Sequence, residues 1–214
     1  MLELTCYKKA ELSKIFGTQN TEGLNRKLER YGIVFEKSGR GKSALYHIQK
    51  IKDPFKVYAI VELGFDGGID FKKLRNFYWY YFNDDEFRTM PDEVKEYRMR
   101  KSNVPVSRQT IANYESHLVT HNLVMVDTKN CIYYFAYKQE QRFVEKEEYL
   151  EAWYQYWDDI DNGLTSFEAI CNMRETYGGV ARKQPIAELN GIYLKEIDYI
   201  MSLIQMSIEN ELDN

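Results

Sequence analysis

The N-terminal part of the chain carries two short runs of apolar residues at helical spacing. Apolar positions at i, i+3 and i+4 predict a helix over residues 8–16, and positions at i, i+4 and i+7 predict a second helix over residues 21–31. Gly17 and Gly32 follow these runs, where helices commonly end. The apolar positions are Leu12, Ile15 and Phe16 in the first run, and Leu24, Leu28 and Tyr31 in the second. Because so few residues separate the two helices, we expect them to cross steeply around a shared core.

A predicted β-hairpin follows directly. Residues 33–35 and 44–48 have the apolar character of two short strands, and Gly39 and Gly41 permit a tight reversal between them. This turn leaves Arg40 and Lys42 at the tip, where a flexible basic loop can enter a minor groove or hold a phosphate. The phosphate-binding loop of an ATPase is disfavoured, because its pattern requires a glycine where Glu36 stands and a helix after Ser43.

The order of two helices, a tight turn and a basic hairpin over residues 7–48 resembles the winged helix domains of phage, plasmid and bacterial transcription or replication proteins. The first unit lacks the helix that opens such a domain. Amide and guanidinium groups outside the core can bond base edges in the major groove. The candidate DNA-binding residues are Gln19, Asn20, Asn25, Arg26, Arg30, Arg40 and Lys42.

The same order of signals recurs over residues 70–138. Spaced aromatic residues predict a helix starting near Asp70, Pro91 opens a second helix that continues to about Ser102, and Ser107 caps a third. In this third helix we expect Ile111, Tyr114 and Leu118 to face inward, and Asn122 to close it in the left-handed conformation.

The third helix of this second unit resembles the recognition helix of many bacterial helix-turn-helix repressors. Its outward polar residues near the N-terminal end are Arg108, Gln109, Thr110 and Asn113. Residues 123–126 and 131–137 then predict a second hairpin around a turn at residues 127–130. Winged helix folds also serve as protein-binding modules, so a protein partner is the alternative to DNA for both units.

Charge is unevenly distributed along the 214 residues. Residues 1–52 contain 11 Lys and Arg against five Asp and Glu, a net charge of +6, whereas residues 139–214 contain six against 16, a net charge of −10. The intervening segments are close to neutral, and the whole chain has a net charge of −4. This asymmetry predicts that the N-terminal end leads contact with DNA and that the acidic end faces another partner.

The C-terminal third has helical apolar spacing, interrupted near Gly178 and Pro185. Its last helix, over residues 192–208, is apolar across a wide arc, which makes a homodimer through the C-terminal helices one candidate assembly. The large aromatic residues of this third are otherwise expected in the core. The acidic group at residues 158–161 has no further ligands at a defined spacing, so a solvated helix end is favoured over a cation site.

No constellation of residues indicates catalysis. The three cysteines are far apart, so neither a disulfide framework nor a zinc site is predicted. His117 and His121 have the spacing of a helical metal pair but lack the glutamate of a metalloprotease. We therefore expect a non-enzyme that uses no metal or other cofactor. No apolar run approaches the length of a membrane span and no signal segment is present, so a cytoplasmic location is expected.

These patterns predict a mostly α-helical α+β protein with small β-hairpin wings. Three regions are expected: a winged helix-turn-helix at residues 1–52, a second winged helix unit at 70–138, and an acidic helical region at 139–214, with a domain boundary within 49–69. The leading function is sequence-specific binding of double-stranded DNA by a transcriptional regulator or a replication initiator of a mobile element. The alternative is a phage-type regulator or inhibitor that grips a protein or nucleoprotein partner.

Overall fold

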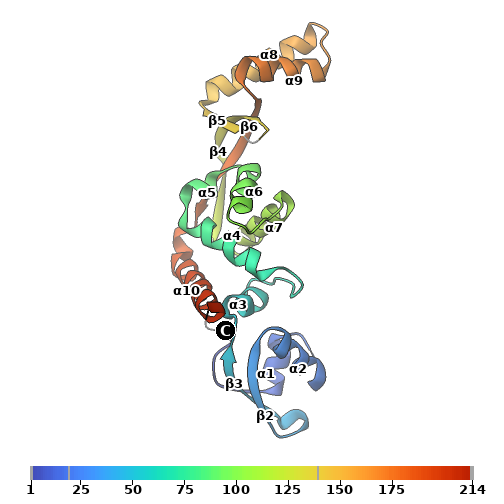
Figure 1. The fold of residues 1–214 in the computed structure, drawn as a ribbon, viewed down its shortest axis with the longest axis vertical. Helices are drawn as coiled ribbons and strands as arrows, with labels where there is room; N and C mark the ends of the chain where they lie inside the picture. The colour runs from blue at the N-terminus through green and yellow to red at the C-terminus, as the bar shows by residue number, and fades with distance from the viewer. Residues whose placement is uncertain (1, 19, 139, 213–214) are drawn as a thin grey trace. The chain divides into compact units, whose positions relative to one another are not determined.

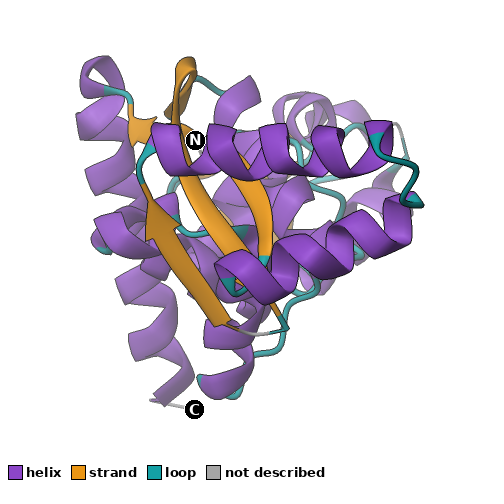
Figure 2. Cartoon of the chain, turned by 90° about the horizontal axis from the view of Figure 1, so that it is seen from above, coloured by secondary structure: helices purple, strands orange, loops and turns teal. Residues whose placement is uncertain are grey.

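The computed structural model describes residues 2–18, 20–138 and 140–212 and shows a mixed α+β protein (Figures 1 and 2). The strands form two three-stranded antiparallel sheets. The chain divides into two compact units: unit 1 comprises residues 1–79 and 192–214, and unit 2 comprises residues 80–191. The α+β class predicted from the sequence is confirmed.

The first part of unit 1 is a small sheet that shares a core with two helices. Its strand order is β1-β3-β2, so the first strand pairs with the returning strand of the hairpin. The elements of unit 1 before its boundary are β1 (Cys6–Lys8), α1 (Lys9–Ile15), α2 (Thr21–Arg30), β2 (Ile33–Ser38), the 3-10 turn η1 (Gly41–Ser43), β3 (Leu45–Ile51), α3 (Pro54–Val61) and the first part of α4 (Phe71–Asn83). Both predicted helices and the first predicted hairpin are confirmed, whereas β1 was not predicted.

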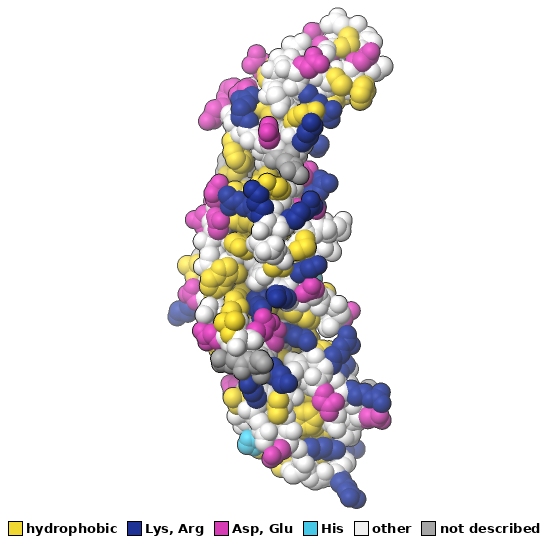
Figure 3. All heavy atoms as spheres, in the orientation of Figure 1, with side chains coloured by type: hydrophobic (Ala, Val, Ile, Leu, Met, Phe, Trp, Pro, Cys, Tyr) yellow, Lys and Arg dark blue, Asp and Glu magenta, His cyan; other side chains and the backbone are white. Residues whose placement is uncertain are grey.

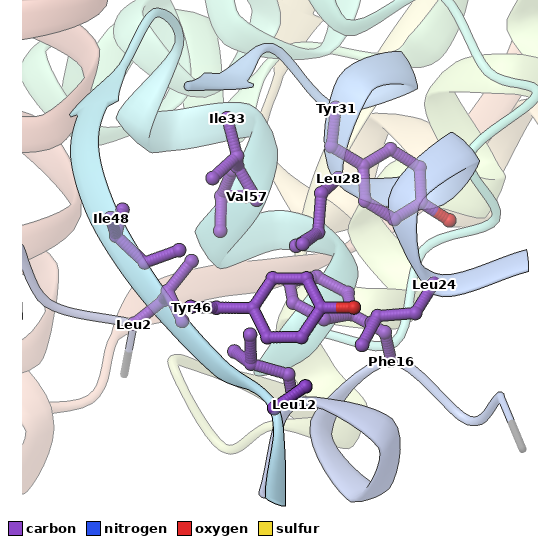
Figure 4. Packing of buried hydrophobic residues seen from close by; sticks show 11 residues of the cluster. Leu2, Leu12, Phe16, Leu24, Leu28, Tyr31, Ile33, Tyr46, Ile48 and Val57 are labelled. Carbon is purple, nitrogen blue, oxygen red and sulfur yellow. The ribbon is translucent and has the colours of Figure 1, made fainter. Parts of the chain in front are cut away.

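The core of this region lies between α1, α2 and the sheet (Figure 4). Leu12, Leu24, Leu28 and Tyr46 have no exposed side-chain surface, so both helical stripes face the same interior as β3. Gly17 and Gly32 adopt positive φ angles of 57° and 75°, as expected of residues that end helices. The apolar residues of α1 and α2 therefore contribute to one shared core, as the sequence pattern predicted.

The boundary predicted within residues 49–69 differs from the division in the structure, which falls after residue 79, and this range contains a helix. Within it, Asp53 caps α3 by accepting a hydrogen bond from the backbone N–H of Lys56 at 2.9 Å. Pro54 occupies the first turn of that helix, where proline is favoured, and Val57 joins the core. Proline here opens a buried helix and does not mark a flexible connection.

The last helix, α10 (Leu194–Leu212), packs against α3 within unit 1. Its buried side includes Ile197, Ile200, Leu203 and Ile204. Near its end, Glu211 pairs at 2.7 Å with the buried Arg75 of α4. Much of the apolar arc on which the homodimer prediction depended is thus covered by the same chain, and the homodimer stays a prediction.

Unit 2 contains a helical group, a long antiparallel ribbon and a helical insertion. Its complete elements are α5 (Asp85–Thr89), α6 (Asp92–Lys101), α7 (Arg108–Thr120), β4 (Val124–Tyr137), β5 (Glu140–Val144), α8 (Lys146–Asp161), α9 (Ser166–Tyr177) and β6 (Val180–Leu189). A short 3-10 turn, η2 (Gly191–Tyr193), follows β6. Ser107 caps α7 as predicted, and Ile111, Tyr114 and Leu118 are buried. Asn122 has the predicted left-handed conformation, with a φ of 57°.

The second predicted hairpin is wrong, because residues 124–137 form one strand that continues in the same direction. β4 is the central strand of the order β5-β4-β6, and its partner β6 comes from much later in the chain. The Asp127 carboxylate accepts hydrogen bonds from the backbone N–H groups of Lys129 and Asn130, and the ladder resumes at Cys131 opposite Pro185. The expected turn is therefore a bulge. Pro185 has no backbone N–H to donate to the ladder. It is tolerated in β6 because the ladder is interrupted at this point.

The acidic region at residues 139–214, expected to be helical, also contains the strands β5 and β6, which were not predicted. Between these strands, α8 and α9 lie side by side and form what we call the α8–α9 hairpin (Figure 1). Its small core contains Ala152 and Met173, packed against Phe135 and Ala181 of the ribbon. In β6 the polar residues 182–184 are followed by Pro185, so the sequence shows no alternation of apolar residues that would indicate a strand. The three functional regions stay a prediction.

Among the residues that the structure describes, no helix combines the length and apolar character that a membrane span requires.

Candidate nucleic-acid interface

The start of α2 is held by a tight cap. The side chain of Asn20 accepts a hydrogen bond from the backbone N–H of Gly23 at 2.5 Å. A Cβ atom on Gly23 would lie 2.9 Å from Asn20 Oδ1 and 3.0 Å from Thr18 Oγ1, so a larger residue would disturb the cap. Asn20 is exposed, but its side-chain oxygen is used within the chain. Gln19, the other predicted contact here, lies outside the described residues.

Asn25 connects α2 to the sheet. Its Oδ1 accepts a hydrogen bond of 2.9 Å from the hydroxyl of Tyr46 in β3, and Asn25 itself is half-buried. The ordinary pKa of tyrosine lies well above neutral and burial raises the pKa of Tyr46 further, so its hydroxyl is a donor at neutral pH. Asn25, expected outside the core, is partly exposed with its carbonyl oxygen bonded within the chain, and its contact with DNA stays a prediction. The sequence did not indicate Tyr46 as its partner.

Two arginines occupy the exposed side of α2. Arg26 is 76% exposed and forms an ion pair of 2.5 Å with Glu22, one helical turn earlier. Such exposed pairs contribute little stability, so DNA phosphates or bases can replace the carboxylate. Arg30 instead donates a hydrogen bond of 3.2 Å to the backbone carbonyl of Gly67. Arg26 is therefore the more available of the two guanidinium groups.

The β2–β3 hairpin presents its basic residues in a defined turn. Gly39 and Gly41 have φ angles of 77° and 64°, which side chains with a Cβ rarely adopt. Between and beside them, Arg40 and Lys42 are exposed, and the Ser43 hydroxyl donates a hydrogen bond of 2.9 Å to the carbonyl of Arg40. The glycines thus fix a turn that holds two cations outside the core.

Residues 1–52 combine this turn with a net charge of +6. Lys and Arg side chains are visible on the surface where Figure 1 places β2 (Figure 3). Lys37 lies 5.9 Å from the centre of the Tyr46 ring, and Lys27 donates to the carbonyl of Phe16 at 2.6 Å, so some cations also serve the fold. The Lys and Arg side chains that remain exposed can attract a polyanion and bind its phosphates.

The corresponding residues of unit 2 have a more acidic setting. Arg108 is 57% exposed and pairs with Glu93 at 2.8 Å and with Glu96 at 3.4 Å. The remaining predicted residues lie in the first two turns of α7. Gln109 donates to Asn113 at 3.3 Å, and the hydroxyls of Thr110 and the cap Ser107 lie 2.9 Å apart. DNA would have to compete with two carboxylates for Arg108, so this helix is the weaker candidate.

A buried charge cluster behind α7 was missed by the sequence analysis. The Lys95 side chain is only 1% exposed, and its Nζ lies 2.5 Å from Glu115 and 3.8 Å from Asp92. Burial raises the pKa of both carboxyls, and Lys95 partly offsets the effect. These residues line a cavity of about 440 Å³ that also receives Lys183 and Gln184 from β6. A lysine in a polar helix gives no sign of such burial.

No group of three or more His, Cys, Asp or Glu side chains within the described part of the chain is arranged to hold a metal ion. The rings of His117 and His121 are stacked, with centres 6.5 Å apart. No protein-family model, curated protein or solved structure matches the chain.

Proposed function

We propose that the chain binds duplex DNA through α2 and the β2–β3 hairpin, as a transcriptional regulator or a replication initiator of a mobile element. One observation carries the proposal. Two helices joined by a short turn precede a hairpin whose return strand lies between its two partners, and the exposed cations Arg26, Arg40 and Lys42 belong to this module. This arrangement fits a winged helix, with α2 as the recognition helix and the hairpin as the wing.

The contacts support a division of labour within the module. Arg26 on the helix can reach base edges, where a guanidinium group binds guanine in two places. Arg40 and Lys42 in the wing can contact the backbone or the minor groove. The Asn25–Tyr46 hydrogen bond joins these two elements, so we assign Asn25 to positioning as well as to contact.

Fluorescence anisotropy with the full chain and a labelled random duplex tests this function. If several phosphates are contacted, affinity should fall roughly tenfold or more between about 50 and 200 mM salt. The full chain is needed, because truncation after residue 138 would remove β6 from the sheet and α10 from α3. The absence of duplex binding at 50 mM salt would contradict the proposal.

A second candidate function is favoured by the surface of the α8–α9 hairpin. Tyr154, Trp157 and Phe167 are 71%, 57% and 74% exposed, although large aromatic residues usually lie inside. Residues 146–177 contain eight Asp and Glu against two Lys and Arg. Acidic and hydrophobic side chains are visible together where Figure 1 places α8 and α9 (Figure 3). Exposed aromatics within an acidic surface suit a basic protein partner and disfavour DNA.

This protein-binding function predicts that the double substitution Trp157→Ala and Phe167→Ala abolishes a complex without unfolding the chain. The measurement is a titration of a purified binding partner against the full chain and the double variant, with circular dichroism as the folding check. Equal binding by both proteins would exclude the hairpin as the contact surface.

Adjacent replication genes or a divergent promoter would separate the two DNA roles, replication initiator and transcriptional regulator.

A further inference from the structure

Unit 1 contains an apolar groove that is separate from the basic module. It lies between residues 2–4, the end of β3, α3 and α10, and has a volume of about 440 Å³. This volume is within the range of small-molecule sites, roughly 300–1,000 Å³. The apolar residues that line it include Leu2, Leu4, Ile51, Val57, Leu203 and Met206. Leu4 and Met206 are 63% and 48% exposed, so the groove is open at its rim.

Two tyrosines on facing helices form one wall. Tyr58 of α3 and Tyr199 of α10 have ring centres 5.8 Å apart, and their planes meet nearly at a right angle. The Tyr58 hydroxyl donates a hydrogen bond to the Glu196 carboxylate, which fixes the ring. Aromatic faces attract organic cations through their quadrupole, and this attraction is stronger where water is excluded.

The charges around this wall have one predominant sign. Glu3 and Glu62 line the groove, Glu196 is bonded to Tyr58, and Lys50 is the cation among the described residues that line it. Burial, followed by neighbouring carboxylates that include Glu62 and Glu196, raises the pKa of Tyr58 and Tyr199. Loss of a tyrosine proton is disfavoured by the same negative potential that attracts a positive ligand.

We propose that this groove binds a hydrophobic organic cation. The apolar lining removes the hydrocarbon surface of the ligand from water, and the tyrosine rings and carboxylates select its positive charge. An anion of equal shape would bury the same hydrocarbon surface but would lack the attraction of the tyrosine rings and carboxylates. The site does not depend on DNA binding, because Arg26, Arg40 and Lys42 are not among the residues that line the groove.

Two probes of nearly the same shape and opposite charge test the proposal: tetraphenylphosphonium and tetraphenylborate. Isothermal titration of the full chain should give a dissociation constant at least about tenfold lower for the cation, a difference of about 1.4 kcal/mol. The substitution Glu3→Gln, at an exposed carboxylate that lines the groove, should weaken cation binding about threefold or more and should not weaken anion binding. Glu147→Gln on α8 removes the same charge outside the groove and should change neither constant.

Three results would overturn the proposal. The first is equal affinity for the two probes, which would show apolar binding without charge selection. The second is unchanged cation affinity in Glu3→Gln, or no binding at millimolar concentration. The third is a chain that sediments as a dimer, becomes a monomer on Leu4→Glu and binds no cation, because a second copy would then be the occupant.

Discussion

Replacing Lys95 by methionine removes the cation from the buried cluster of unit 2. The two side chains have similar length, so the change mainly leaves Glu115 and Asp92 in a buried site without their counter-charge. Removing one member of a buried ion pair typically costs about 3–5 kcal/mol, because the remaining charge stays desolvated. Glu115 is 23% exposed and retains some contact with water, so we expect a loss near the lower end, about 3 kcal/mol.

The loss should depend on pH in a defined direction. Burial already raises the pKa of Glu115 and Asp92 in the folded chain, and removal of Lys95 should raise both further. A carboxyl with a raised pKa binds more protons in the folded state than in the unfolded state, so its contribution to stability falls as pH increases through that interval. Lys95→Met should therefore be more destabilising at pH 8 than at pH 5.

Urea unfolding followed by tryptophan fluorescence measures this effect, because Trp153 and Trp157 lie in unit 2. The matched control is Lys129→Met, which removes an exposed lysine and should change the free energy of unfolding by no more than about 0.5 kcal/mol. Adding Glu115→Leu to Lys95→Met should recover part of the loss. A loss below about 1 kcal/mol with no difference between pH 5 and pH 8 would refute the desolvated ion cluster.

Three further substitutions test other parts of the account. Arg26→Ala should cost about 1–3 kcal/mol on a preferred duplex and relax sequence preference, which competition with random duplex measures. Tyr46→Phe removes the hydroxyl bonded to Asn25 and should destabilise unit 1 by about 0.5–1.5 kcal/mol in thermal unfolding; an unchanged melting temperature would make that bond unimportant. Gly179→Ala would place a Cβ atom 2.8 Å from the backbone nitrogen of Ala136, so a loss of about 1–3 kcal/mol in urea unfolding is expected, and wild-type stability would contradict the contact.

Local patterns predicted what depends on neighbouring residues. Helices α1, α2, α6 and α7 followed from apolar spacing and capping residues, because these signals act within a few positions. The β2–β3 hairpin followed from its glycines for the same reason. The exposure of Arg40 and Lys42 at its tip could also be predicted, because side chains in the turn between two strands have few neighbours that could cover them.

Long-range pairing could not be predicted in the same way. β4 was divided at residues 127–130 because Asp and Asn favour turns, and only its partner β6 extends it into one strand. α3 was hidden by Pro54, which equally marks a turn or a first helical residue. The Asn25–Tyr46 and Lys95–Glu115 contacts join residues 21 and 20 positions apart, so neither partner identifies the other in the sequence.

The dependence of duplex affinity on salt most directly tests whether the β2–β3 hairpin contacts DNA. If Arg40 and Lys42 each neutralise a phosphate, replacing both by alanine should reduce the slope of log affinity against log salt concentration by about 2. The control replaces Lys129 and Lys138, exposed lysines of unit 2, and removes the same charge from elsewhere. We predict a smaller slope and weaker binding to all duplexes for the hairpin variant, with the control close to the unmodified chain. Equal slopes in all three proteins, or a reduction only in the control, would contradict the proposed DNA interface.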